Sequence, residues 1–274
     1  MSGRIEARFA ERAGEGRCLL VAFLTAGDPD PALTAPAMTA LVDAGADLIE
    51  LGMPFSDPMA DGPVIQQSSE RALAKGVGLA HVLDAVRQFR RADAHTPVVL
   101  MGYLNPLEQV GLAPYALDAA AAGVDGMLIV DCPAEEIDTS QAALAAADLR
   151  QIFLVAPTTS ADRVQRICDN ASGFIYYVSL KGITGADSLA ADSVCAALQE
   201  LRQLSRVPVG VGFGIKTPAQ AAALAGSADA IVVGSAVVEA LAPARDVAAL
   251  SAAAQAVLGP LRQAIDQARN KESS

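Results

Sequence analysis

The chain has 274 residues, a length that fits one large domain or two smaller ones. Apolar residues make up 52 %, but aromatic residues only 4 % and tryptophan is absent, so aliphatic side chains must fill the core and an aromatic-rich β-sandwich is disfavoured. The net charge of −11 excludes nucleic acid and anionic membranes as partners, and any phosphate site must therefore rely on local backbone dipoles.

Short apolar runs recur along the chain, each apolar on both faces, as the buried strands of a parallel sheet are. The predicted strands are residues 19–25, 47–51, 97–102, 126–130, 151–155, 174–179, 208–212 and 230–233. The segments with helical spacing between them are residues 31–44, 79–91, 112–122, 134–147, 161–170, 188–204 and 218–225. This alternation predicts an α/β fold, a single (β/α)8 TIM barrel formed by residues 1–274.

Three segments are expected to extend the minimal barrel. An amphipathic helix over residues 5–13 precedes the first strand and is predicted to cap the bottom of the barrel. An extra helix, residues 63–74, is predicted between the second and third strands. A last helix over residues 247–268 is followed by a polar tail, residues 269–274, for which the sequence predicts fraying. An open doubly wound sheet is disfavoured because the turn at residues 25–29 lacks the Gly-x-Gly-x-x-Gly pattern.

The cysteines and the N-terminus indicate the cellular compartment. The four cysteines are scattered and form no Cys-x-x-Cys pair, so we expect reduced, mostly buried thiols. The sequence shows no apolar leader and no run of ~18 uncharged apolar residues. A cytoplasmic protein with no membrane association is therefore predicted.

Glu50 stands out as a carboxylate inside the apolar second strand. Alternation places Glu50 and Leu48 on one face, and Ile49 and Leu51 on the other. If the Leu51 face meets the helices, Glu50 points into the mouth of the barrel, where active sites of this fold lie. A buried structural ion pair is the alternative, but no basic partner is near in sequence. Burial is expected to raise the pKa of Glu50, so that it can give and take a proton near neutral pH.

The loop after this strand is stiff and contains a second candidate carboxylate. Three prolines and two aspartates occur within residues 54–63. Asp61 precedes Gly62-Pro63, where a helix is expected to start, so compensation of the helix dipole is as good an explanation as catalysis. Because the strand-to-loop excursion can bring Glu50 and Asp61 into one pocket, the two form a candidate acid–base pair.

Glycines after the last two strands predict a phosphate site. The segments 210–215 and 233–236 are rich in glycine, which lets backbone N–H groups approach an anion closely. The loops after strands seven and eight are the usual phosphate site of this fold. Each glycine pattern alone indicates only a tight turn, whereas both together favour phosphate. The segment 179–185, after the sixth strand, has the composition of a lid with glycine hinges.

Other chemistries are disfavoured by the residues that would carry them. None of the lysines falls in a predicted strand, which argues against a Schiff-base aldolase. The two histidines, His81 and His95, form no cluster with each other or with cysteine, so no metal site is expected. No serine lies in a Gly-x-Ser-x-Gly turn. A metal-free, phosphate-binding barrel with a carboxylate pair remains.

Several motifs make the chain similar to a known family. The longest is ELGMPFSDPMADGP at residues 50–63. The others are FLTAGDP at 23–29, LMGYLNP at 100–106, GITG at 182–185, VGFGI at 211–215 and GS at 234–235. In this order they closely resemble the tryptophan synthase alpha chain family over nearly the whole chain. The family often has a polar residue at the position of Gly102 and an aromatic one at Leu104, which leaves one pocket wall undefined.

The resemblance implies a lyase of tryptophan biosynthesis that cleaves indole-3-glycerol phosphate into indole and glyceraldehyde 3-phosphate. Glu50 and Asp61 fall on the family's catalytic residues. The residues that would border the indole ring are Phe23, Tyr103 and Tyr176. Those that would hold the phosphate, largely through backbone N–H groups, are Gly185, Gly212, Phe213, Gly214, Gly234 and Ser235. Thr184 would lie in the lid and meet Asp61 on closure.

The resemblance also implies a partner, a beta subunit that carries pyridoxal phosphate in an α2β2 heterotetramer, so that this chain needs no cofactor of its own. The residues that match surfaces facing that partner are Asp57, Pro58, Asn105 and Pro106, although Asp57 could be only a solvated turn residue.

Three alternatives stay open. A stand-alone indole-producing lyase would be active without a beta subunit. Another phosphate-binding barrel, such as a sugar-phosphate epimerase or isomerase, would share the glycine sites but would not need the Pro-Phe-Ser-Asp-Pro loop. An activating subunit that has lost catalysis is disfavoured because both Glu50 and Asp61 are present.

Overall fold

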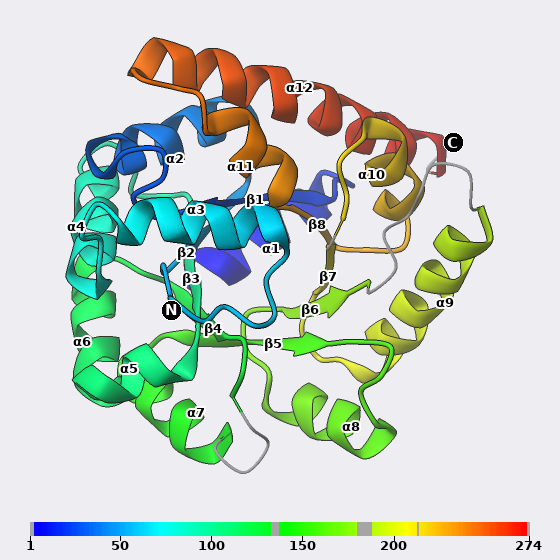
Figure 1. The fold of residues 1–274 in the computed structure, drawn as a ribbon. Coiled ribbons are helices and arrows are strands. Elements are labelled where there is room, and N and C mark those ends of the chain that lie inside the picture. The colour runs from blue at the N-terminus through cyan, green and yellow to red at the C-terminus, as the bar shows by residue number, and fades with distance from the viewer. Residues whose placement is uncertain (1–2, 133–136, 180–187, 213, 273–274) are drawn as a thin grey trace.

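The computed structural model describes residues 3–132, 137–179, 188–212 and 214–272. Its strands form one closed parallel barrel in which β8 pairs back onto β1 (Figure 1). The strands are β1 Leu19–Thr25, β2 Leu48–Gly52, β3 Val98–Gly102, β4 Gly126–Ile129, β5 Arg150–Val155, β6 Ile175–Val178, β7 Val209–Gly212 and β8 Ala230–Val233. The predicted (β/α)8 barrel is confirmed.

Helices surround the barrel on all sides (Figure 1). From the N-terminus to β4 they are α1 Arg4–Gly14, the 3-10 turn η1 Pro31–Leu33, α2 Thr34–Asp43, α3 Pro63–Leu73, α4 Leu79–Arg90, α5 Leu104–Val110 and α6 Leu112–Ala122. After β4 they are α7 Ile137–Ala146, α8 Ala161–Asn170, α9 Ser188–Leu204, α10 Pro218–Ala225, α11 Ser235–Leu241 and α12 Val247–Glu272. Helices α3 and α4 both lie between β2 and β3, so the extra helix is present as predicted.

The strands separate two apolar cores, because successive side chains of a strand point to opposite faces. One core fills the barrel interior and the other lies between the barrel and the helices. In β2, Leu48 belongs to the interior core, whereas Ile49 and Leu51 belong to the core under the helices. The same alternation gives Glu50 the inward face that the sequence predicts.

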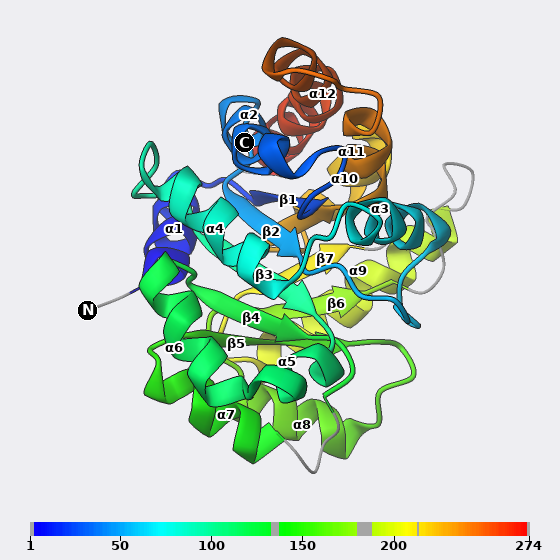
Figure 2. The same ribbon diagram turned by 60° about the vertical axis from the view of Figure 1, so that its left-hand side comes forward.

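Helix α1 closes the amino-terminal end of the barrel, as predicted. Its buried side chains are Ile5 and Phe9, which join the interior core. The ring of Phe9 lies 5.7 Å from that of Phe174, which directly precedes β6. Burying two such side chains contributes about 3–6 kcal/mol. In Figure 2, α1 lies at the end where the strands begin, and α3 lies towards the opposite end.

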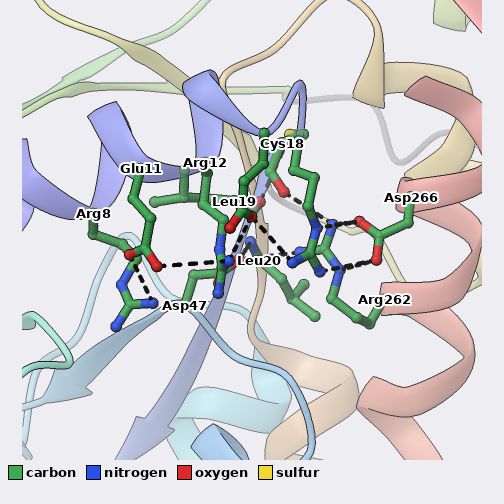
Figure 3. A network of polar contacts seen from close by, with 11 residues as sticks. Arg8, Glu11, Arg12, Cys18, Leu19, Leu20, Asp47, Arg262 and Asp266 are labelled. Carbon is green, nitrogen blue, oxygen red and sulfur yellow. Dashed lines mark hydrogen bonds and ion pairs between the residues drawn. The ribbon is translucent and has the colours of Figure 1, made fainter. Parts of the chain in front are cut away.

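A buried carboxylate ties both ends of the chain to the barrel (Figure 3). Asp47 directly precedes β2, is 2 % exposed and accepts a hydrogen bond from the backbone N–H of Leu20 at 2.9 Å. Arg12 of α1 donates to its carboxylate at 2.7 Å and Arg262 of α12 at 3.0 Å. Arg262 also pairs with Asp266 one helical turn later. Four elements, α1, β1, β2 and α12, therefore meet at one carboxylate.

The same arrangement recurs before two other even-numbered strands. Asp125 precedes β4 and accepts the backbone N–H of Val98, in β3, at 2.8 Å. Asp229 precedes β8 and accepts the backbone N–H of Val209, in β7, at 2.9 Å. In each case a carboxylate satisfies an N–H group near the start of the preceding strand, which would otherwise be buried without a partner.

Some elements differ from the sequence-based prediction. Helix α5 is unpredicted, because its first N–H group bonds to Asp131, in the loop after β4, at 2.7 Å, a tertiary contact. Helix α7 is described from Ile137 onward, and residues 134–136 of the predicted helix lie outside the described residues. Helix α12 continues to Glu272, into the segment for which the sequence predicts fraying. There Arg269 donates to two backbone carbonyl oxygens, each at 2.9 Å.

The cysteines are free and mostly buried, as predicted. Cys18, Cys132 and Cys168 are buried and Cys195 is half-buried. Burial raises the pKa of the Cys18 thiol to about 12, which disfavours its reactive thiolate form. None of the helices in the described parts of the chain is long and apolar enough to cross a membrane.

Candidate active site

A cavity of about 860 Å³ lies at the carboxyl ends of the strands, where active sites of this fold are found. Every strand, or the loop that follows it, contributes to the cavity wall. Its apolar lining includes Met101, Val130, Leu154, Val178 and Val232. An apolar cavity of this size with a few polar groups suits a small molecule that contains a hydrophobic ring.

Glu50 faces this cavity from β2 and is 3 % exposed. Its side chain forms no ion pair within the described ranges, so the structural alternative of a neutralised buried glutamate finds no support. Burial, together with the nearby negative charge of Asp61, raises the pKa of Glu50 to about 8. The carboxyl group is therefore protonated at neutral pH but close to ionisation, so it can first act as an acid and then as a base.

Asp61 lines the same cavity from the loop between β2 and α3. Burial raises its pKa to about 6, while a hydrogen bond from the Tyr103 hydroxyl acts in the opposite direction. The same hydroxyl accepts the backbone N–H of Ala60 at 3.1 Å. Gln66 of α3 holds the loop by donating to the backbone oxygen of Asp61 at 2.8 Å. Asp61 is thus the more acidic of the two carboxyl groups and is mainly ionised at neutral pH.

The structure brings the two carboxyl groups together across the 11 positions that separate them in sequence. The negative charge of Asp61 helps to raise the pKa of Glu50. Burial is the main cause of the raised pKa of the Tyr176 hydroxyl, and the charges of Glu50 and Asp61 add to it. No group of three or more His, Cys, Asp or Glu in the described ranges could hold a metal ion. The catalytic roles of Glu50 and Asp61 stay a prediction.

The three aromatic residues predicted to border an indole ring occupy two adjoining spaces. Phe23 of β1 and Tyr176 of β6 line the main cavity. Tyr103, after β3, lines a small adjoining space of about 10 Å³ together with Phe23 and Asp61. Its ring also packs against Phe55 of the β2–α3 loop, with 5.3 Å between the ring centroids. Tyr103 therefore supports the wall that carries Asp61.

Three of the six residues predicted to hold phosphate line the cavity. Gly214 follows β7, and Gly234 and Ser235 follow β8. Helix α11 begins at Ser235, so its first N–H groups have no partner within the helix. Gly212 lies inside β7 and is not part of the wall; a Cβ atom there would clash with the Tyr176 hydroxyl. Phe213, Gly185 and the predicted lid residue Thr184 lie outside the described residues.

The residues predicted to face a partner lie beside the cavity. Asp57 is exposed and Pro58 half-buried, both in the β2–α3 loop. Asn105 is exposed and Pro106 half-buried in the first turn of α5. Next to Pro58, the side chain of Met59 is 83 % exposed. Large exposed apolar side chains beside polar ones are common where another protein binds.

The loop between β5 and α8 contributes to the cavity wall although no motif indicates it. Its lining residues are Ala156, Thr158, Thr159 and Ser160, and Arg163, in the first turn of α8, lines the cavity beside them. Lys216, in the loop after β7, is a further lining residue that the motifs do not indicate. A signal for the β5 loop exists in the sequence, because its hydroxyl-rich run directly follows an apolar strand, the position where functional residues of this fold concentrate.

Known proteins are similar to this chain over nearly its whole length. The sequence profile of the tryptophan synthase alpha chain family matches residues 9–266. The tryptophan synthase alpha chain of Xanthomonas oryzae pv. oryzae is 57 % identical over 267 residues, which cover 97 % of this chain and 99 % of that protein. The alpha chain of Xylella fastidiosa is 56 % identical over 263 residues, with coverages of 96 % and 98 %.

Solved structures are similar over the same length. The tryptophan synthase subunit alpha from Legionella pneumophila has a TM-score of 0.89 and 42 % identity, and the match covers 97 % of this chain and 100 % of that one. A chain of the aminoacrylate-bound tryptophan synthase from M. tuberculosis has a TM-score of 0.84 and 34 % identity, with coverages of 96 % and 100 %. The chain therefore belongs to the tryptophan synthase alpha chain family.

Proposed function

We propose that this chain is a lyase that cleaves indole-3-glycerol phosphate into indole and glyceraldehyde 3-phosphate, as the alpha subunit of a tryptophan synthase. The observation that carries the proposal is the interacting pair Glu50 and Asp61 in one apolar cavity, with pKa values raised to about 8 and about 6. Membership of the tryptophan synthase alpha chain family supports the same reaction.

The proposed reaction is a retro-aldol cleavage, which needs an acceptor for the electrons of the breaking bond. Glu50 gives its proton to C3 of the indole ring, and the ring becomes an iminium-like cation. The resulting Glu50 carboxylate then takes the proton of the glycerol hydroxyl next to the ring. The C–C bond breaks, its electron pair returns to the ring, and an aldehyde forms. Ionised Asp61 accepts the indole N–H and stabilises the cation by its charge.

The other lining residues would hold the two ends of the substrate. Phe23 and Tyr176 offer aromatic faces to the indole ring, and Tyr103 supports Asp61 beside it. Gly214, Gly234 and Ser235 would hold the phosphate at the opposite end, largely through backbone N–H groups. The proposed phosphate set is completed by Gly185 and Phe213, and the proposed lid residue is Thr184. Gly212 lies outside this set because it packs against Tyr176 and does not line the cavity.

Tyr103→Phe is expected to shift the acidic limb of the pH profile of kcat/KM to higher pH. Catalysis requires ionised Asp61, so activity falls below about pH 6, where Asp61 becomes protonated. Loss of the Tyr103 hydroxyl removes a hydrogen bond that lowers the pKa of Asp61, so the pKa of Asp61 rises in the variant. The profile of indole release against pH measures the shift.

Tyr177→Phe is the matched control for this experiment. Tyr177 lies in β6 but belongs to the core under the helices, away from the cavity. The acidic limb of the Tyr177→Phe profile should coincide with that of the wild type. A Tyr103→Phe profile that also coincides with the wild type would show that the hydroxyl does not tune Asp61.

We further propose that the chain docks on a pyridoxal-phosphate beta subunit in an α2β2 assembly, with Asp57, Pro58, Asn105 and Pro106 at the contact. The exposed loop around Asp57 and the exposed Met59 support this placement. Pyridoxal phosphate belongs to the partner in this proposal, and the reaction proposed for this chain uses only its own side chains. A cytoplasmic location stays a prediction.

Asp57→Ala is expected to weaken activation by the beta subunit by at least about fivefold, equivalent to about 1 kcal/mol. Basal indole release without the beta subunit should stay within about twofold of the wild type, because the exposed Asp57 side chain does not line the cavity. Titrating the variant with a beta subunit measures both quantities. Asp84→Ala, at an exposed position of α4, is the control. Equal losses in basal and activated rates would count against a contact role for Asp57.

An indole-release assay with and without a beta subunit tests the proposed function. Release of indole that rises with the beta subunit supports an alpha subunit, whereas high activity that the beta subunit leaves unchanged supports a stand-alone lyase. A protein that only accelerates the beta subunit would be an activating subunit. No turnover of indole-3-glycerol phosphate, together with turnover of a sugar phosphate, would favour an epimerase or isomerase.

A further inference from the structure

The electrostatics of this chain oppose capture of the substrate proposed above. The chain carries a net charge of −11, and two carboxyl groups line its main cavity. A phosphorylated substrate is therefore repelled at long range. Backbone N–H groups act only at contact, so they cannot draw the anion in from solution. Positive charge beside the cavity would offset this repulsion, and two of its lining residues, Arg163 and Lys216, supply it.

Arg163 contributes a positive charge to the cavity wall. It lies in the first turn of α8, is exposed and lines the cavity beside the hydroxyl residues Thr158 and Ser160. No ion pair or hydrogen bond joins its guanidinium to any residue in the described ranges. Arg166, three positions later on the same helix, differs because it pairs with Asp138 at 3.5 Å and does not line the cavity.

Lys216 contributes a second charge that is partly neutralised. It follows Gly214 by two residues and lines the cavity together with Ser235. Its ammonium group lies 3.2 and 3.3 Å from the two carboxylate oxygens of Glu239, on α11. Both side chains are about half exposed, so solvent and salt screen the pair. Helix α8, which carries Arg163, and helix α11 lie on opposite sides of the barrel (Figures 1 and 2).

We propose that Arg163 and Lys216 are a capture pair for the phosphate of the substrate, with Glu239 restraining Lys216 until the anion arrives. The inference rests on the proposed function and adds two positioning residues to it. The pair acts before and during binding, while the glycine N–H groups hold the bound phosphate. The pair acts on the phosphate and not on the reacting carbon atoms, so it affects capture and affinity rather than the chemical step.

Charge-removing variants test the pair with two readouts, steady-state indole release and calorimetric binding of glycerol 3-phosphate. Arg163→Gln and Lys216→Gln should each raise KM and the Kd of glycerol 3-phosphate by about three- to tenfold, with kcat within about twofold. Glu239→Gln should have the opposite effect and tighten binding by about two- to threefold, because it frees Lys216. All three effects should shrink between about 20 mM and 500 mM NaCl, since salt screens exposed charges.

Arg166→Gln is the matched control and should leave both readouts unchanged, and Arg163→Lys should retain most of the wild-type affinity. The proposal fails if Arg163→Gln behaves like Arg166→Gln, if the losses persist at high salt, or if kcat falls as much as kcat/KM. Failure of the proposed function gives a different result. The chain would then release no indole but would still bind glycerol 3-phosphate in a salt-dependent way that Arg163→Gln weakens. This result would refute the lyase reaction and support the capture pair.

Discussion

Replacing Glu50 by Gln is expected to lower kcat for indole release by about 10²- to 10⁴-fold, the contribution of one positioned acid–base group. Gln has nearly the same size and fits the same position in β2. It has no proton to give to indole C3 and no charge with which to take the proton of the glycerol hydroxyl. Steady-state assays measure kcat, and the Kd of glycerol 3-phosphate should stay within about twofold of the wild type.

The pH dependence of stability shows whether Glu50→Gln loses activity because it lacks the proton or because its fold is damaged. Burial raises the pKa of Glu50 from 4.5 to about 8, so the folded state favours the protonated form. This contribution to stability is fully present below about pH 4.5 and is lost as the pH rises through about 8. Because Gln cannot ionise, Glu50→Gln should melt at a higher temperature than the wild type near about pH 9, with a smaller difference near about pH 5. Full activity in Glu50→Gln would refute the assignment, and earlier melting near pH 9 would show that the loss comes from the fold.

Glu50 could be located from the sequence because its position obeys a local rule. A buried strand has a side-chain period of two, so the apolar Ile49 and Leu51 mark the face under the helices and leave Glu50 on the inward face. The strand ends at Gly52, which places Glu50 near the carboxyl end and therefore beside the cavity. For Asp61 the local pattern left two explanations open, and only the resemblance to a family selected catalysis.

Features that depend on two distant segments could not be predicted in the same way. The hydrogen bond between Tyr103 and Asp61 joins the end of β3 to the loop after β2. Gly212 and Gly214 look equivalent in the sequence, but Gly212 packs against Tyr176 and only Gly214 lines the cavity. The contribution of Arg163 depends on how the loop after β5 folds over the barrel. None of these relationships has a periodicity or a short-range motif that encodes it.

Asp47→Ala is expected to destabilise the protein by about 3–5 kcal/mol, the usual cost of removing one partner from a buried charged network. The substitution leaves the backbone N–H of Leu20 without its acceptor and removes a partner from both Arg12 and Arg262. Arg12 lies on α1 and Arg262 on α12, so the contacts of both terminal helices weaken together (Figure 3). For a chain of this size the loss corresponds to a melting temperature lower by about 6–20 °C.

Two further variants interpret this loss of stability: Asp47→Asn separates the charge of Asp47 from its role as a hydrogen-bond acceptor, and Asp43→Ala is the surface control. Asp47→Asn keeps an acceptor for Leu20 but loses the charge, so its melting temperature should lie between those of Asp47→Ala and the wild type. Asp43→Ala, at an exposed position of α2, should change stability by no more than about 0.5 kcal/mol. Because Asp47 precedes β2 and does not line the cavity that Glu50 faces, kcat of folded Asp47→Ala measured well below its melting temperature should match the wild type. A melting temperature of Asp47→Ala equal to that of Asp43→Ala would mean that the two arginines find other partners, and that the termini do not depend on this carboxylate.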